Sequence, residues 1–202
     1  MEDRLILSAV ASDPTLLALD FDPKGRWFEF EAEIAQMPGG VDHYPGLFFG
    51  YRCNGDDPTR RYSFLALKLD ESPRGDANPS SLLFGSMYFD PGGGGVIGPE
   101  FNSFRAFPGA KGNYQLPPAN LKEQKGWRHI RVRALDDRIT VAVDHDPKPL
   151  VSLDLAELNA PCATCRGLPL DPRGALGIWQ HKGRGMFRNI LVAALPSEQI
   201  GR

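Results

Sequence analysis

The chain has 202 residues and a formal net charge of −2. That length suits one β-sandwich domain over residues 1–202, which can build a core without disulfides. Nucleic-acid-binding proteins carry basic patches, whereas the arginines here are spread along the chain, so we expect no nucleic-acid partner. No apolar run approaches the length that spans a membrane.

The amino-terminal segment ends in Ala9-Val-Ala11, which resembles a signal-peptide cleavage site. The residues before it carry two acids against one arginine, and the apolar run is too short for a signal peptide. We therefore expect an edge strand here. Without a targeting signal the location stays open, and the cytoplasm is the default.

Short segments rich in β-branched and aromatic residues follow one another, separated by most of the 18 prolines and 22 glycines. Turn-forming residues placed between short strands in this way are typical of a many-stranded antiparallel protein. The predicted strands are Leu5–Val10, Thr15–Leu19, Arg26–Gln36, Gly46–Cys53, Tyr62–Leu69, Ser80–Phe89, Trp127–Ala134, Arg138–Asp144, Leu150–Leu153, Ala175–His181 and Gly185–Leu195. One short helix is predicted over Leu153–Asn159.

Three connections are informative. Asp136-Asp137 predicts a tight turn between two strands. Asp90–Leu121 is rich in glycine and proline, with only Phe101–Phe107 strand-like, so we predict one long loop there. The run Gly174–Leu195 predicts a hairpin, because glycine in the short turn at 182–184 provides the positive φ that hairpin turns need.

The three cysteines are Cys53, Cys162 and Cys165. An odd number is atypical of the disulfide framework of small secreted proteins. Cys162 and Cys165 have the C-x-x-C spacing of redox pairs and half zinc sites, but no second such motif exists. We expect a loop with free thiols or a local disulfide, and a redox or metal role is the alternative.

Four segments resemble one family, in the family's order. They are Trp27–Glu33, Pro45–Arg52, Gly126–Val143 and Gly174–Leu195, and the last, with its Gln-His and Phe-Arg-Asn-Ile pieces, is the most specific. Together they resemble the concanavalin A-like lectin and glucanase jelly roll, and within it the 3-keto-disaccharide hydrolase family. The resemblance implies an all-β sandwich of two antiparallel sheets and a sugar-cleaving activity.

The chain departs from that family in a segment that would line the cleft. The family carries an acidic-Gln pattern there, whereas Tyr62–Asp70 has neither Glu nor Gln. The family's Asn-Gly turn is also replaced, by Asp144–Leu150. We therefore predict a non-catalytic recognition domain that binds carbohydrate or a protein surface, as an accessory module of a larger bacterial protein. The alternatives are an enzyme that cleaves oxidised disaccharides and a purely structural or interaction domain.

The acidic strand Trp27–Glu33 supplies the candidate acid. Glu29, Glu31 and Glu33 alternate on one strand face, so neighbouring carboxylates lie about 7 Å apart, within the separation used by inverting glycosidases. If the protein is an enzyme, we expect Glu33 and His181 to be catalytic. The alternative is a solvated acidic face, balanced by arginines on a neighbouring strand.

Four residues are the candidates for ligand binding: Arg52, Trp179, Gln180 and His181. The amide and imidazole of Gln180-His181 suit sugar hydroxyls, and the Trp179 ring suits the apolar face of a pyranose, unless it belongs to the core. An enzyme would further require Glu33, Arg52 and His181 to converge in one cleft.

The loop Asp144-His145-Asp146 is the candidate for a metal. Its carboxylates are ligand types that calcium prefers, and the jelly-roll resemblance implies calcium in such loops. Asp-His-Asp-Pro is equally good turn chemistry. No other cofactor is expected.

Overall fold

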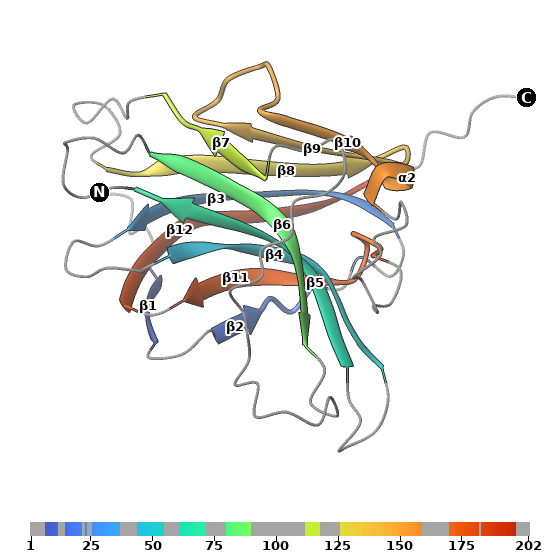
Figure 1. The fold of residues 1–202 in the computed structure, drawn as a ribbon, viewed down its shortest axis with the longest axis horizontal. Coiled ribbons are helices and arrows are strands. Elements are labelled where there is room, and N and C mark those ends of the chain that lie inside the picture. The colour runs from blue at the N-terminus through green and yellow to red at the C-terminus, as the bar shows by residue number, and fades with distance from the viewer. Residues whose placement is uncertain are drawn as a thin grey trace, which may run out of the picture.

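The computed structural model describes residues 7–11, 15–21, 23, 26–36, 44–54, 61–71, 80–89, 112–117, 126–158, 170–181 and 183–196. They form two six-stranded antiparallel sheets (Figure 1). The predicted fold class, an all-β sandwich of two antiparallel sheets, is confirmed. No helix in these ranges is long and apolar enough to cross a bilayer.

The strands of each sheet come from both halves of the chain. Sheet A runs in the order β1 (Leu7–Ala11), β12 (Gly183–Leu195), β3 (Trp27–Gln36), β8 (Arg128–Leu135), β9 (Arg138–Val143) and β10 (Val151–Asp154). Sheet B runs in the order β2 (Thr15–Ala18), β11 (Ala175–His181), β4 (Tyr44–Asn54), β5 (Arg61–Asp70), β6 (Ser81–Phe89) and β7 (Asn113–Gln115). The short helix α2 (Leu155–Leu158) follows β10.

Each strand predicted from the sequence is present within two residues at either end. The tight turn at Asp136-Asp137 is confirmed, since both residues have positive φ, as the two central residues of a type I′ hairpin turn do. The strand β7 was missed because three residues are too few to show a period. It lies within the predicted loop Asp90–Leu121, and the strand-like Phe101–Phe107 falls outside the described residues.

The core lies between the two sheets and follows the alternation of the strands. Phe28, Phe30, Ala32 and Ile34 of β3 are fully buried there, while the glutamates that alternate with them are half-buried. The facing layer includes Phe49 of β4 and Phe84 of β6, whose rings stack 6.2 Å apart. Each such aromatic side chain contributes roughly 1.5–3 kcal/mol by leaving water.

The predicted carboxy-terminal hairpin is wrong. The strand β11 pairs with β2 and β4 in sheet B, and the strand β12 pairs with β1 and β3 in sheet A. The chain therefore changes sheet between His181 and Gly183 instead of folding back on itself. Glycine with positive φ serves both kinds of corner, so the local signal could not distinguish them.

Candidate functional site

The outer face of sheet B, which points away from the core, carries an aromatic cluster. Phe48, Phe64 and Trp179 are almost completely buried in it, together with Ala66. The Phe64 ring lies 5.7 Å from Trp179 and 5.9 Å from Phe48, centroid to centroid. Because these rings sit on three adjacent strands, they form a continuous apolar layer.

The cluster depends on a glycine between Trp179 and Lys68. In the sheet register Gly46 of β4 lies between Trp179 of β11 and Lys68 of β5, on the same face. A Cβ at Gly46 would lie 1.8 Å from the backbone oxygen of Leu67. The strands are therefore too close at this point for any side chain at residue 46.

Three polar side chains border the aromatic cluster at one end of sheet B. The His181 ring stacks nearly parallel to Tyr44 at 6.0 Å, and the Lys68 ammonium lies 3.6 Å from the centroid of the Tyr44 ring. His181 also lies 6.1 Å from Trp179. We call Tyr44, Lys68 and His181 the polar rim. It combines an ammonium, an imidazole and a phenol, all of which can hydrogen-bond a polar ligand.

The structure separates the four predicted ligand residues. Trp179 is fully buried in the aromatic cluster on the outer face of sheet B, and not in the core between the sheets, so its ring is not exposed. Gln180, its neighbour, points between the sheets, where its Oε1 lies 2.2 Å from the position of a Cβ at Gly185 of β12. Only His181 lies beside a residue of the outer face that is partly exposed, Tyr44, although His181 itself is only 6% exposed.

Arg52 lies at the opposite end of β4 from Tyr44, roughly 25 Å along the strand. Its guanidinium pairs with the Asp171 carboxylate at 2.6 Å. Asp171 also accepts hydrogen bonds from the backbone and the side chain of Arg173, at 3.0 and 2.9 Å. The Arg173 guanidinium in turn lies 4.9 Å from the Trp27 ring of sheet A. Arg52 is therefore part of a link between the sheets, far from His181.

This link makes the stability of the protein depend on pH. Burial raises the pKa of the Asp171 carboxyl, but the hydrogen bonds and charges of Arg173 and Arg52 outweigh burial, so the pKa of Asp171 is held below its usual range. A folded-state pKa below the unfolded one means that the unfolded chain protonates first as the pH falls. The stabilisation is therefore complete above about pH 4 and is lost as the pH falls toward the folded pKa.

We expect the variant Asp171→Asn to lose the acid-sensitive part of this stability. Urea denaturation from about pH 7 to about pH 2 should show the variant least stable relative to wild type at neutral pH, with the two curves converging in acid. The control is Asp154→Asn, which removes an exposed carboxylate paired with Arg138. Wild-type and Asp171→Asn curves that stay parallel throughout would contradict the expected role of Asp171.

The candidate acid Glu33 lies on the outer face of sheet A. Its carboxylate pairs with Arg188 and accepts a hydrogen bond from the Asn189 amide at 3.0 Å. The Arg188 guanidinium also lies 4.1 Å from the Trp127 ring. The sandwich therefore separates Glu33 from His181, so the convergence of Glu33, Arg52 and His181 expected for an enzyme is not found.

These contacts explain the most specific sequence motif in physical terms. Phe187 is fully buried in the core, and Asn189, with a φ of +50°, sits where the pairing of β12 with β3 shifts register. Asn tolerates this backbone conformation better than most residues. The Phe-Arg-Asn-Ile piece thus anchors β12, bends it and fixes Glu33.

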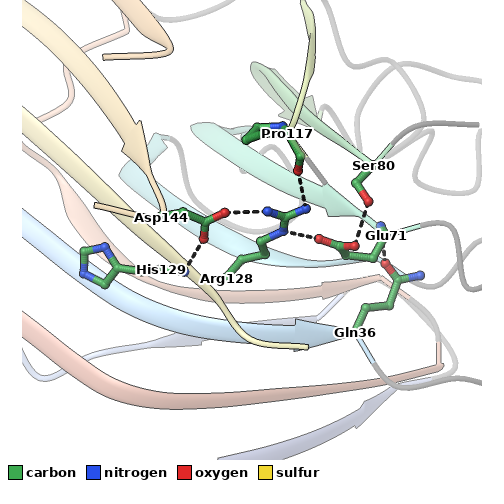
Figure 2. Close-up of polar contacts among 7 residues, drawn as sticks. All are labelled: Gln36, Glu71, Ser80, Pro117, Arg128, His129 and Asp144. Atoms are coloured by element: carbon green, nitrogen blue, oxygen red, sulfur yellow. Dashed lines mark hydrogen bonds and ion pairs between the residues drawn. The ribbon is translucent and has the colours of Figure 1, made fainter. Parts of the chain in front are cut away.

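A buried arginine cluster joins the two sheets at the other end from Arg52, and Figure 2 shows its residues converging. Arg128 of β8 is fully buried and pairs with Glu71, directly after β5, and with Asp144, directly after β9. It also donates to the backbone oxygen of Pro117 at 2.8 Å. Glu71 accepts a further hydrogen bond from Ser80 at 2.7 Å. One guanidinium therefore connects the ends of strands from both sheets.

Sequence reasoning missed this cluster. Arg128 lies on the same strand face as Ile130 and Val132, so the alternation already predicted that this arginine is buried. A buried arginine needs acidic partners, and this signal could have indicated the cluster. Burial lowers the pKa of Arg128, but the hydrogen bonds and charges of Glu71 and Asp144 outweigh it and raise the pKa above its usual value. The guanidinium is therefore always charged, and its two carboxylates are committed to it.

The same contacts occupy the candidate metal loop. Both carboxylate oxygens of Asp144 accept hydrogen bonds, one from Arg128 and the other from the backbone N–H of His129. Asp146 accepts from the backbone N–H of Lys148 at 2.9 Å, as in a turn. Among the described residues no group of three or more His, Cys, Asp or Glu side chains is placed to hold a metal ion. Cys162 and Cys165 lie outside the described residues, and Cys53 is exposed with a free thiol.

No family model matches this chain, and no curated protein matches it. Among solved structures it is similar to a legume lectin-like domain from Entamoeba histolytica, with 10% identity, a TM-score of 0.48 and coverage of 97% of this chain and 86% of that one. It is similar to a pseudo β-1,3-glucanase and immunostimulatory antigen of Mycobacterium tuberculosis, with 13% identity, a TM-score of 0.45 and coverage of 96% and 76%. A protein of unknown function from Saccharomyces cerevisiae has 9% identity, a TM-score of 0.47 and coverage of 96% and 89%. At such identities the likeness concerns the fold alone.

Proposed function

We propose that the protein is a non-catalytic recognition domain that binds carbohydrate at the polar rim of sheet B. The observation that carries the proposal is the convergence of Tyr44, Lys68 and His181 beside an aromatic layer. Sugars bind where hydrogen-bonding groups adjoin aromatic surface, because a pyranose has polar edges and apolar faces. Tyr44 keeps part of its surface accessible, whereas the Trp179 ring contributes only support from below.

The state of the carboxylates favours recognition over hydrolysis. Glycoside cleavage needs an acid and a base on opposite sides of one bond. Glu33, Glu71 and Asp144 are each committed to an arginine, and Glu31 lies 3.2 Å from His129 Nε2. We therefore propose no sugar-cleaving activity for this protein, although four of its segments resemble strands of the 3-keto-disaccharide hydrolases.

The experiment is a glycan array followed by calorimetry with the best oligosaccharide. We expect His181→Ala and Tyr44→Phe each to weaken binding about 10-fold, the loss of roughly one hydrogen bond. The matched control is His145→Ala, which removes an imidazole stacked at 3.9 Å on another ring, His129, on the opposite sheet. Absence of binding to any glycan, or equal affinities for all three variants and wild type, would overturn the proposal.

A further inference from the structure

The outer face of sheet A carries side chains that are mostly exposed or half-buried, although Ala142 is only 7% exposed and the His129 ring is covered by His145. It consists of the side chains Leu191 and Ala193 of β12, Glu29, Glu31 and Glu33 of β3, His129, Arg131 and Arg133 of β8, and Thr140 and Ala142 of β9. Leu191 is 63% exposed, the more exposed of the two large hydrophobic residues that are open to solvent within the described ranges. Leu191 lies on β12, directly beside the acidic strand β3, so an apolar side chain borders the charged part of this face.

The charges on this face form two opposite rows. The acids stand on β3 and the bases on β8, with Glu29 opposite Arg133 and Glu31 opposite Arg131 in the register. In the part of the chain that the structure describes, Glu29, Arg131 and Arg133 nevertheless make no ion pair. When a second copy of this face is rotated by half a turn and laid on the first, its acidic row lies on the basic row of the first copy and its basic row on the acidic one.

The strand order places these two rows at the centre of the sheet. Sheet A has the order β1, β12, β3, β8, β9, β10, so three strands lie on each side of the line between β3 and β8 (Figure 1). A two-fold axis along that line, between two stacked copies, sets β3 on β8, β12 on β9 and β1 on β10. We infer that the protein forms a symmetric dimer in which the outer faces of sheet A pack together about this axis.

Specific contacts follow from the register. Glu29 of each copy faces Arg133 of the other, so the central ion pair occurs twice. Leu191 lies in the row Leu191–Glu31–Arg131–Ala142, and the rotation sets it on Ala142 of the second copy. An exposed leucine thereby meets the smallest side chain of its row. The twist of the sheets displaces the central pairs least, because they lie closest to the axis.

The size of the face fits a dimer. Six strands about 4.8 Å apart and about 25 Å long cover about 600 Å² per copy. Stable interfaces bury about 800 Å² of accessible surface per partner, and the accessible surface of protruding side chains exceeds the flat area of the sheet that carries them. The proposed function is independent of this contact, since the polar rim lies on the other sheet.

The first test is sedimentation equilibrium from about 1 µM to about 1 mM, which covers moderate to weak association. We expect a mass that rises to twice the 22.2 kDa of one chain. A mass of one chain across the whole range would overturn the dimer.

The second test is a matched pair of exposed leucines. Leu191→Asp sets a carboxylate on Ala142 of the second copy and should yield monomers, whereas Leu17→Asp, on β2 of sheet B, should leave the dimer intact. Both side chains are exposed, so neither variant should unfold, and circular dichroism checks this. A dimer that survives Leu191→Asp uses another surface, and the inference is then wrong.

The third test is charge reversal, which identifies the pair. Glu29→Arg and Arg133→Glu should each weaken the dimer about 10-fold or more, because each juxtaposes like charges twice. The double variant restores both pairs and should recover the wild-type association. Failure of the double variant to recover, with its monomer folded, would refute the proposed axis.

Discussion

Replacing Arg128 by methionine should destabilise the folded protein by about 3–5 kcal/mol, because two partly buried carboxylates lose their partner. The methionine retains the length and packing of the arginine stem, so the loss reports the charge and its hydrogen bonds. Glu71 and Asp144 would face each other across the gap without the guanidinium between them. Urea denaturation at neutral pH measures the change as a lower midpoint with an unchanged slope.

Two further variants test the interpretation. Arg138→Ala removes an exposed arginine that also pairs with an aspartate, Asp154, and should cost only about 0–1 kcal/mol. Neutralising the carboxylates in the Arg128→Met background, with Glu71→Gln and Asp144→Asn, should recover part of the lost stability. Equal losses for Arg128→Met and Arg138→Ala would mean that the cluster does not hold the sheets together.

Gly46→Ala should cost at least about 4 kcal/mol, an exceptional loss for a single methyl group. The added Cβ would lie 1.8 Å from the backbone oxygen of Leu67, and β4 is held between β11 and β5 on both sides. Neither neighbouring strand can move without breaking sheet hydrogen bonds, so no small shift of the backbone relieves the clash. Thermal denaturation followed by circular dichroism, together with the yield of soluble protein, measures the effect.

The comparison is with Gly126→Ala. No atom lies within 4 Å of a Cβ at Gly126, but its φ is +80°, a conformation that disfavours alanine. That variant should cost about 1 kcal/mol, the backbone term alone. If both variants cost the same, the close approach of β4 to β5 is not what requires glycine at residue 46.

Local periodicity was sufficient to predict the strands and the faces of β3 and β8. A period of two is a property of neighbouring residues, so Glu29, Glu31 and Glu33 were placed on one outer face without any knowledge of the fold. The alternative interpretation, a charge balance between this row and the arginines of a neighbouring strand, agrees with the register, which sets Glu29 opposite Arg133 and Glu31 opposite Arg131.

Sheet membership was not predictable, because it depends on residues far apart in the chain. Alternation along β11 sends the side chains of Gln180 and His181 to opposite faces, and only the place of β11 in the sandwich decides that Gln180 points between the sheets. The burial of Trp179 was not predictable from the sequence either, because its neighbours Phe48 and Phe64 come from other strands. A single sequence shows which side chains share a strand face but not which strands share a sheet.

The position of β12 has a consequence for folding kinetics. It inserts between β1 and β3, so Phe187 pairs with Leu7 across almost the whole length of the chain, and β11 closes sheet B against β2 in the same way. Contacts at such separation raise the contact order, and proteins of this kind fold slowly. Until the last strands have been synthesised, β3 and β4 expose unpaired edges that can recruit other chains. The interval between synthesis of β3 and arrival of β12 is therefore when this protein is most prone to aggregate.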